Sequence, residues 1–210
     1  MKNIPRITIY RLSQYYRCLE EFEEKGWTRI SSQILADELG IKATQLRKDL
    51  THFGQFGVRG LGYDINKLKK SIGKVLGNHK PWNIVVIGAG ALGSALASYA
   101  GFSKHNFFIE GLFDIDPNKI NTTIHGAKIY PMDKLSEFVK SKNISIAILA
   151  VPASSAIGAI TLVWKSGISA VLNFVPLRLK PPPGCQVRQV DLSTTLESLT
   201  YFLTRRSSFK

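Results

Sequence analysis

From residue 10 to residue 40 the chain alternates apolar and polar positions with the period of an α-helix. Between residues 10 and 25 the apolar side chains fall three or four positions apart, and Gly26 follows where a helix would end. Ser31 and Ser32 then precede a shorter amphipathic run, which stops at Gly40. This pattern predicts a helix of about four turns followed by a short second helix.

A third helical run covers residues 43–53, just after this glycine and two further residues. Leu46, Leu50 and Phe53 lie four and three positions apart, so they share one face of the expected helix. Two short helices joined by a three-residue turn that contains glycine are typical of a helix-turn-helix.

The next segment, residues 54–63, holds four glycines and one basic residue. Because glycine adopts positive φ without cost, this spacing predicts a tight hairpin, which we call the wing. Residues 64–77 are typical of a basic amphipathic helix, and residues 78–82 of a linker. We therefore expect a domain boundary near residue 80.

Beyond this boundary the chain changes to short apolar runs separated by helical stretches. The runs predicted to be strands cover residues 83–87, 107–113, 145–151, 170–174 and 187–190. Strands that alternate with helices in this way predict a parallel α/β sheet.

The chain ends on an amphipathic pattern. Leu192, Leu196, Leu199 and Leu203 fall on one side of an expected helix. The predicted fold class is therefore α/β, with domains divided as follows: a winged helix-turn-helix domain at residues 1–80, a Rossmann domain with a parallel sheet at residues 81–191, and a C-terminal helix and tail at residues 192–210.

The charge balance narrows the class of partner. Lysine and arginine number 28 against 15 aspartate and glutamate residues, which gives a formal net charge of +13. Such an excess favours a polyanion, either nucleic acid or a membrane surface. Residues 143–164 contain no charged side chain, but Pro152, Gly158 and three serines interrupt them. A buried strand that leads into a helix explains this segment better than a membrane span does.

The remaining composition argues against several kinds of site. Cys18 and Cys185 lie too far apart in the sequence for a recognisable disulfide or metal spacing, and they suit a cytosolic protein. The four histidines are scattered singly, and no nucleophile with an adjacent base is discernible. Residues 1–10 lack the sustained apolar core of a secretory signal. We expect a cytoplasmic protein with no metal site and no catalytic residues.

A glycine-rich motif directly follows the first predicted strand of the second domain. Its residues are Gly88, Ala89, Gly90, Ala91, Leu92 and Gly93. The first glycine permits the turn, the second lets a pyrophosphate approach the backbone, and the third lets helix and strand pack closely. Asp114 lies 21 residues after Gly93, at the end of the next predicted strand. There it would accept hydrogen bonds from the adenosine ribose and repel a 2′-phosphate, which favours NAD(H) over NADP(H).

Two later turns are further candidates for the cofactor site. Val151 and Pro152 end one predicted strand, and Asn173 and Phe174 end the next. Ligands of open α/β sheets bind at the carboxyl ends of strands, so both turns are expected to line the nicotinamide half of the pocket. Taken alone, each is also typical of an ordinary turn.

The third predicted helix supplies candidate contacts to nucleic acid. Gln45, Arg47, Lys48 and Thr51 fall off its apolar face and could enter a major groove, where arginine reads guanine and glutamine reads adenine. An ordinary solvated helix face has the same pattern. Arg59 in the wing is a second signal, because a single cation on a slim hairpin fits a narrow minor groove. With the net charge, these residues predict binding to double-stranded DNA.

Two other function classes stay open at this point. One is an NAD-dependent oxidoreductase whose basic N-terminal domain serves assembly, although the roughly 35 residues after Phe174 leave little room for a substrate domain. The other is a DNA-binding sensor of a different nucleotide, such as FAD or coenzyme A. A domain of this type that binds no nucleotide is a further alternative.

Five segments occur together, in order, over nearly the whole chain: Ile30-Ser31-Ser32, Leu46-Arg47-Lys48-Asp49-Leu50, the run from Phe53 to Tyr63, the run from Gly88 to Gly93, and Leu172-Asn173-Phe174-Val175-Pro176. They resemble the Rex family of bacterial redox-sensing transcriptional repressors. The second and third segments are the most specific. The resemblance implies a homodimer that occupies a palindromic operator when NAD⁺ prevails and leaves it when NADH rises.

The resemblance also implies roles for single residues. Arg47, Lys48 and Arg59 would contact DNA, and the glycine-rich motif with Asp114 would hold the cofactor. In that family the C-terminal helix crosses to the partner subunit.

Members of the family have a polar network that rearranges between their DNA-bound and NADH-bound forms. Its residues correspond here to Arg17, Tyr99 and Asp191. One departure stands out. Ala156-Ile157 occupies the position where family members usually carry Ala-Gln, which puts the usual contacts of that helix in doubt.

Overall fold

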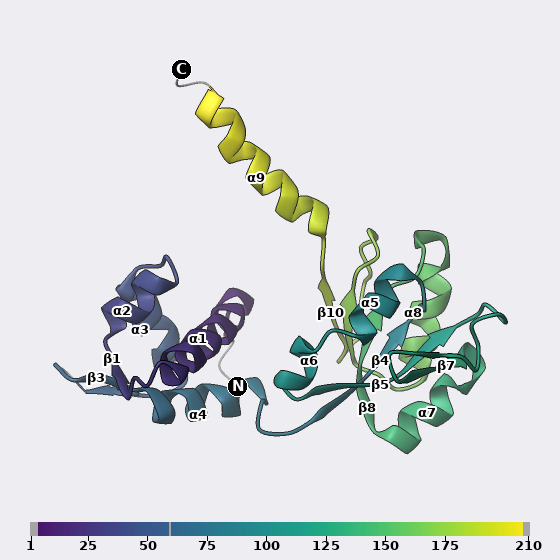
Figure 1. Cartoon of the computed structure of the whole chain (residues 1–210), viewed down its shortest axis with the longest axis horizontal. Coiled ribbons are helices and arrows are strands. Elements are labelled where there is room, and N and C mark those ends of the chain that lie inside the picture. Colours follow the sequence, from purple (N-terminus) through teal and green to yellow (C-terminus); the bar gives the residue numbers. More distant parts are fainter. Residues whose placement is uncertain (1–3, 59, 208–210) are drawn as a thin grey trace. The chain divides into compact units, whose positions relative to one another are not determined.

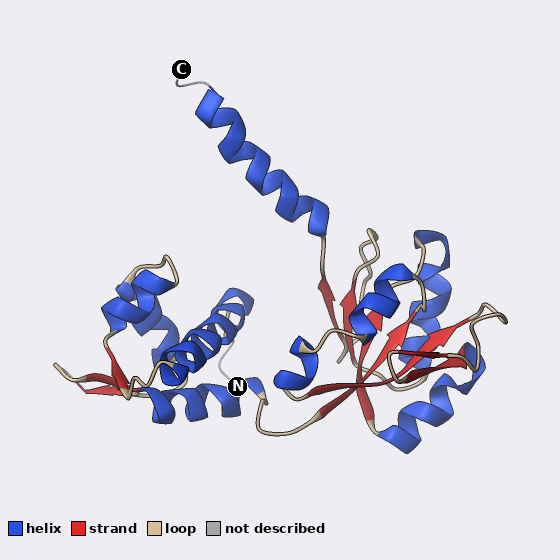
Figure 2. Ribbon diagram, in the orientation of Figure 1, coloured by secondary structure: helices blue, strands red, loops and turns tan. Residues whose placement is uncertain are grey.

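A computed structural model describes residues 4–58 and 60–207 of the chain. The chain divides between Lys80 and Pro81 into two units. Each unit has its own apolar core, and Figures 1 and 2 show how the helices and strands are distributed between them.

The first unit is built from helices and a small antiparallel sheet. Its elements are α1 (Arg6–Glu24), β1 (Arg29–Ile30), α2 (Ser32–Glu38), α3 (Ala43–Thr51), β2 (Gly57–Val58), β3 (Gly62–Asp64) and α4 (Ile65–Leu76). The strands lie in the order β1-β3-β2. Helices α2 and α3 form the predicted helix-turn-helix, and β2 and β3 form the predicted wing. α3 ends at Thr51, earlier than the sequence pattern indicated.

Side-chain caps fix where two of these helices begin. The Ser31 hydroxyl accepts a hydrogen bond from the Ile34 N–H at 3.1 Å, and the Asp64 carboxylate accepts one from the Lys67 N–H at 2.9 Å. Both are N-caps, which satisfy an amide that has no partner within its helix. At the other end of α4, Gly77 adopts φ +79°, a left-handed conformation that ends the helix.

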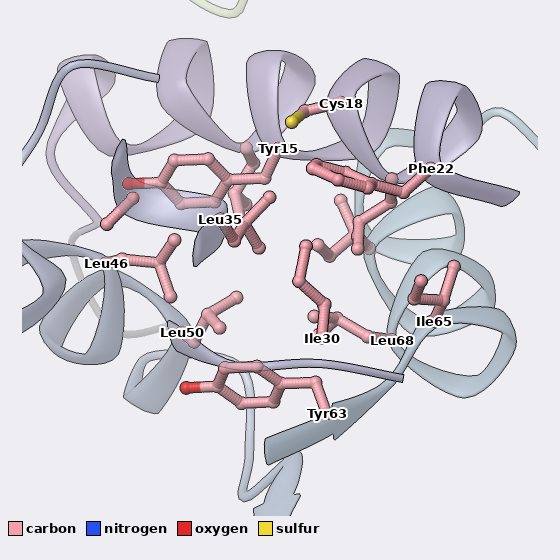
Figure 3. Packing of buried hydrophobic residues seen from close by; sticks show 14 of the residues in the cluster. Tyr15, Cys18, Phe22, Ile30, Leu35, Leu46, Leu50, Tyr63, Ile65 and Leu68 are labelled. Atoms are coloured by element: carbon pink, nitrogen blue, oxygen red, sulfur yellow. The ribbon is translucent and has the colours of Figure 1, made fainter. Parts of the chain in front are cut away.

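The core of the first unit lies between α1 on one side and β1 and β3 on the other (Figure 3). Apolar side chains enter it from every helix of the unit; those shown are Tyr15, Cys18, Phe22, Ile30, Leu35, Leu46, Leu50, Tyr63, Ile65 and Leu68. Because α3 contributes Leu46 and Leu50 to this core, its opposite face is left for solvent or a partner.

The second unit is an α/β sheet. Its strands are β4 (Trp82–Ile87), β5 (Phe107–Asp114), β6 (Thr123–Ile124), β7 (Ala127–Pro131), β8 (Ile144–Leu149), β9 (Ala170–Asn173) and β10 (Gln186–Gln189). They lie in the order β10-β9-β8-β4-β5-β7-β6, and every pair is parallel except β6 with β7. Without β6, this is the strand order of a dinucleotide-binding Rossmann sheet. The predicted fold class is confirmed.

Both faces of this sheet are covered (Figure 2). The covering elements are α5 (Ala91–Ala97) and α6 (Gly101–Lys104) on one face, and α7 (Leu135–Lys142) and α8 (Ala156–Lys165) on the other. Along β4, Ile84 and Val86 face the first pair of helices, whereas Val85 and Ile87 face the second. Strands buried on both faces consist of continuous apolar residues, which explains the uncharged pattern of the sequence.

Three-residue 3₁₀ turns, η1 (Met132–Lys134) and η2 (Ala153–Ser155), precede α7 and α8. The uncharged segment 143–164 therefore forms β8, η2 and most of α8. Within the described residues, no helix has both the length and the apolar character needed to cross a bilayer. The chain continues into α9 (Leu192–Ser207).

Candidate nucleic-acid interface and nucleotide site

Helix α3 presents basic side chains on the face opposite its core residues. Arg47, Lys48 and Thr51 are exposed, as the sequence pattern predicted. The guanidinium Nη1 of Arg47 donates to the Ser32 hydroxyl at 2.8 Å, so the first turn of α2 fixes this side chain. The Thr51 hydroxyl donates to the Lys48 carbonyl at 2.7 Å. Among the described residues, no carboxylate forms an ion pair with Lys48, which leaves its charge available to an anionic partner.

Gln45 differs from this expectation. Its side chain is half-buried, and its amide Nε2 donates to Asp49 Oδ1 at 3.0 Å. The prediction placed Gln45 on the outward face because it lies off the apolar positions of α3. The structure corrects this placement, because a carboxylate one turn along the helix draws the amide toward the core. Whether Gln45 also contacts DNA stays a prediction.

The carboxylate of Asp49 is the polar centre of the first unit and was missed by sequence reasoning. It is 1% exposed and accepts hydrogen bonds from Thr8 Oγ1 at 3.2 Å and Tyr15 OH at 2.7 Å. Arg11 adds two more, from Nε at 2.5 Å and Nη2 at 2.8 Å. Thr8, Arg11 and Tyr15 lie on α1, so this cluster ties α1 to α3. The available signal was the position of Asp49, three residues after Leu46 on the core face of the helix.

Burial and hydrogen bonding act in opposite directions on these groups. Burial raises the pKa of Asp49, but hydrogen bonds from Arg11, Tyr15 and Gln45 outweigh it and hold that pKa below its usual value. The pKa of Tyr15 is raised, first by burial and then by its bond to the Asp49 carboxylate. Asp49 is therefore an anion that only accepts hydrogen bonds, and Tyr15 is a neutral donor.

The wing lies beside α3. The Leu61 N–H donates to the Val58 carbonyl at 3.0 Å and closes the turn, while Arg29 Nε donates to the Leu61 carbonyl at 3.3 Å and ties the turn to β1. Arg59, the predicted minor-groove contact, lies outside the described residues. A hollow of about 560 Å³ separates wing and helix, lined by Ser31, Ser32, Arg47, Thr51, Gln55 and Gly57 among others.

In the second unit, the glycine-rich motif forms the turn between β4 and α5. Gly88 adopts φ +100°, and a Cβ on it would lie 2.4 Å from the Ala150 carbonyl oxygen. A Cβ on Gly93 would lie 1.9 Å from the Gly88 carbonyl oxygen. In contrast, nothing lies within 4 Å of a Cβ built on Gly90. The motif therefore has the tight turn and close helix packing predicted for it, with open space at the glycine where a pyrophosphate would approach.

Ala89, Ala91 and Leu92 complete this turn. Ala89 is buried, while Ala91 and Leu92 are exposed at the start of α5. The turn lies between the carboxyl ends of β4 and β8, because the Ala150 N–H donates to the Ile87 carbonyl at 2.8 Å. In sheets of this strand order, the switch point between these two strands is the ligand-binding crevice.

Asp114 ends β5 next to this turn. Its Oδ2 accepts from the Ala89 N–H at 2.7 Å, and its Oδ1 accepts from the N–H groups of Ile115 at 2.8 Å and Asp116 at 3.0 Å. Lys119 Nζ lies 3.6 Å from Asp114 Oδ2. Burial raises the pKa of Asp114, but these backbone donors and Lys119 outweigh it and lower the pKa. Asp114 is thus a carboxylate anion that is able to accept from ribose hydroxyls.

The two later turns differ from each other. Val151 is half-buried and Pro152 exposed after β8, and Val151 Cγ1 lies 2.9 Å from a Cβ built on Gly88. Phe174 is half-buried after β9. Asn173 is fully buried, and its amide bonds the carbonyl of Leu177 at 2.9 Å and other protein atoms. The Asn173 side chain thus supports the turn, and its contact with a ligand stays a prediction.

The three residues of the implied switch lie on different elements. Arg17 is exposed on α1 of the first unit. Tyr99 is 60% exposed after α5, with its ring centroid 5.1 Å from that of Phe102. Asp191 is exposed and its Oδ1 accepts from the N–H groups of Ser193 and Thr194, which caps α9.

Helix α9 exposes a row of large apolar side chains. Leu192, Leu196, Leu199, Phe202 and Leu203 are each 56–64% exposed. A helix with such an apolar stripe needs a partner surface in water.

Among the described residues, no three His, Cys, Asp or Glu side chains come together in a metal-binding arrangement.

Two family models match the chain. One, described as "CoA binding domain", matches residues 79–177, which hold the glycine-rich turn and most of the sheet. The other, described as "Putative DNA-binding protein N-terminus", matches residues 3–51, which hold α1, α2 and α3.

Three curated proteins similar to this chain carry the name "Redox-sensing transcriptional repressor Rex". The protein from Carboxydothermus hydrogenoformans is 46% identical over 202 residues, which cover 96% of this chain and 97% of that protein. The protein from Desulforamulus reducens is 44% identical, with 95% of each chain covered. The protein from Clostridioides difficile is 43% identical, with 96% of each chain covered.

Solved structures agree with these relatives. The crystal structure of RSP in complex with β-NAD⁺ and operator DNA has a TM-score of 0.92 and 35% identity, covering 100% of this chain and 96% of that one. The structure of RSP in complex with β-NADH has a TM-score of 0.90 and 33% identity, covering 100% and 98%. RSP is described as a Rex-family repressor.

Proposed function

The chain belongs to the Rex family of redox-sensing transcriptional repressors, and from that membership we propose that it binds a palindromic operator as a homodimer and releases it when NADH binds. Its relatives are named as repressors, which places it among regulators rather than enzymes. Its proposed place of action is the cytoplasm, where the DNA and the NADH pool of a bacterium are found.

The observation that carries this proposal is the presence in one chain of a basic α3 face and a glycine-rich turn beside a carboxylate. We assign residues 1–80 to DNA binding. Arg47 and Lys48 would enter the major groove from α3, with Thr51 beside them. Arg59 would reach the minor groove from the wing.

Residues 81–191 would hold NADH or NAD⁺. The open approach at Gly90 suits the pyrophosphate, and the Asp114 carboxylate suits the adenosine ribose. When bound, the nicotinamide supplies the redox difference that the protein senses. Val151, Pro152 and Phe174 would surround it.

The preference for NADH follows from the charge of the nicotinamide ring. The oxidised ring is a cation, whereas the reduced ring is neutral. Phe174 packs against the apolar core, and an apolar pocket formed over it would penalise the desolvation of a cation and so favour NADH over NAD⁺. A ligand shifts an equilibrium between two states only through such a difference in affinity.

The effect on DNA requires a dimer. We assign residues 192–210 to dimerisation through the apolar row of α9, which would cross to the partner subunit. Two recognition helices must match half-sites about 34 to 36 Å apart, or a multiple of this distance. Rearrangement of Arg17, Tyr99 and Asp191 on NADH binding would change that separation and lower the affinity for DNA.

The test is fluorescence anisotropy of a labelled palindromic duplex from the protein's own promoter. We expect NADH to release the duplex at concentrations at least about tenfold below those of NAD⁺, and NADPH and coenzyme A to release it poorly. Lys48→Ala should lower operator affinity, whereas Lys165→Ala, an exposed lysine of α8, should not. Equal release by NADH and NAD⁺ would refute the proposal, and release by coenzyme A alone would favour a sensor of that nucleotide.

A further inference from the structure

The contact between Gln45 and Asp49 carries information about base recognition. Both residues lie on α3, four positions apart, so their side chains meet on the same side of the helix. Gln45 is half-buried at the border between the core and the exposed face that holds Arg47 and Lys48. A side chain in this position touches the protein with one end and is able to touch DNA with the other.

The chemistry of Asp49 decides which end of the amide faces the protein. An ionised carboxylate only accepts hydrogen bonds, and Asp49 is held in that form by Arg11. It therefore accepts a hydrogen bond from the NH₂ group of Gln45. The amide oxygen is itself an acceptor and cannot donate to the carboxylate. Oε1 lies on the other branch of the same planar group and is turned away from Asp49. No described residue donates a hydrogen bond to it.

The position of Asp49 is itself fixed from another helix. Thr8, Arg11 and Tyr15 of α1 hold both carboxylate oxygens, at 2.5–3.2 Å. The carboxylate is 1% exposed, so water does not compete for it. The orientation of the Gln45 amide is thus set by a buried cluster that exists before any DNA is bound.

We propose that Asp49 is a positioning residue for operator recognition: it holds the amide nitrogen of Gln45 and presents Oε1 to the major groove as a hydrogen-bond acceptor. This inference rests on the proposed DNA binding. The groups that donate in the major groove are the exocyclic amines, N6 of adenine and N4 of cytosine. Gln45 would therefore select a base that carries such an amine and reject guanine and thymine at that position.

This differs from the usual contact of glutamine with adenine, which uses both ends of the amide at once. Here the nitrogen is shared with Asp49, so recognition depends on the oxygen. The result is a specificity that requires Asp49, although Asp49 itself is buried and touches no base.

The experiment measures a recognition profile with the full-length protein. Each adenine of the operator half-site is replaced in turn by purine, and each cytosine by 2-pyrimidinone, because each analogue lacks only the exocyclic amine. For the wild type, we expect one analogue position to lower affinity by roughly 5- to 100-fold. Gln45→Met has a similar length but no amide, and it should abolish the difference between natural base and analogue at that position.

Asp49→Asn should reduce the affinity difference between natural base and analogue at the same position. The double variant with Gln45→Met and Asp49→Asn should show no further reduction than Gln45→Met alone. Tyr15→Phe removes one hydrogen bond to Asp49 and tests the same link with less risk to folding. We expect this variant to lose part of the affinity difference between natural base and analogue at that position. Thermal unfolding checks that every variant is folded. The matched control is Gln33→Met, since Gln33 Nε2 donates to Asp37 Oδ1 at 2.7 Å with the same spacing, but on the exposed face of α2.

Three outcomes would overturn the inference. Gln45→Met could keep the wild-type profile, in which case the amide reads no base. A folded Asp49→Asn could lose affinity equally on every duplex, in which case Asp49 is only structural. Should Asp49→Asn not fold, an unchanged profile for Tyr15→Phe would have the same meaning. Failure of the wild type to bind any operator is distinct from all of these, because it would contradict the proposed function itself.

Discussion

The Asp114 carboxylate accepts a hydrogen bond from the backbone N–H of Ala89 at 2.7 Å, across the glycine-rich turn. One side chain thereby supports the turn and provides the acceptor for the ribose. We expect Asp114→Ala to lower NADH affinity by about 10- to 100-fold, the usual range for a hydrogen bond to a charged group. A fluorescence titration of NADH measures this.

The control for Asp114→Ala is Asp133→Ala, an exposed aspartate of η1 outside the proposed site. It should leave NADH affinity unchanged. Operator affinity without NADH should be the same for wild type and both variants. An Asp114→Ala protein that binds NADH as tightly as the wild type would show that Asp114 is not the ribose acceptor.

Two glycines of the second unit should respond in opposite ways to alanine. In Gly93→Ala the new Cβ would lie 1.9 Å from the Gly88 carbonyl oxygen, so the turn must shift and NADH binding should be lost. In Gly158→Ala the Cβ meets nothing within 4 Å, within α8, so the free energy of unfolding should rise by about 0.5–1 kcal/mol. Chemical denaturation and NADH titration of both variants test this pair, and full NADH binding by Gly93→Ala is the contrary result.

The apolar row on α9 should be required for the dimer. Leu196 is 64% exposed, and a charged side chain there would be buried in the proposed interface. We expect Leu196→Glu to shift sedimentation toward the monomer and to weaken operator binding. Leu162→Glu, at an exposed leucine of α8, should do neither. A Leu196→Glu protein that stays dimeric would remove α9 from the interface.

Stability should depend on pH through Asp49. Its pKa is lowered in the folded protein, because hydrogen bonds from Arg11, Tyr15 and Gln45 outweigh burial, so the folded state resists protonation more than the unfolded state does. Its contribution to stability is present at neutral pH and is lost as the pH falls below about 4 and through the lowered pKa. The difference in unfolding free energy between wild type and Asp49→Asn should therefore shrink on acidification. A difference that stays constant from pH 7 to pH 3 would contradict this.

The sequence predicted those elements that are determined by residues close together along the chain. The glycine-rich turn and Asp114 were recognisable because spacing along the chain determines their geometry. The buried strands β4 and β8 were recognisable because parallel strands covered on both faces are continuous apolar runs. The hairpin of β6 and β7 was missed, because β6 is only Thr123–Ile124 and lies among polar residues.

The side-chain contacts that the sequence did not predict depend on distant partners. Gln45 lies off the apolar face of its helix, but Asp49 draws it inward, and Asp49 is held by Thr8, Arg11 and Tyr15, which lie 34–41 residues earlier. The spacing of apolar residues along the chain does not predict a cluster of polar side chains from two different helices. The end of its strand predicts Asn173 near the ligand, but it does not predict that the amide also bonds the Leu177 carbonyl and Gln189.

The central claim is that NADH in the second unit and DNA on the first are coupled, and reciprocity of binding tests it most directly. The affinity of the homodimer for NADH is measured by fluorescence, first alone and then with saturating operator. Coupling requires that operator weaken NADH binding by the same factor by which NADH weakens operator binding, a factor we expect to be about 5 to 150. Equal NADH affinity with and without operator, in a protein that binds both, would contradict the account.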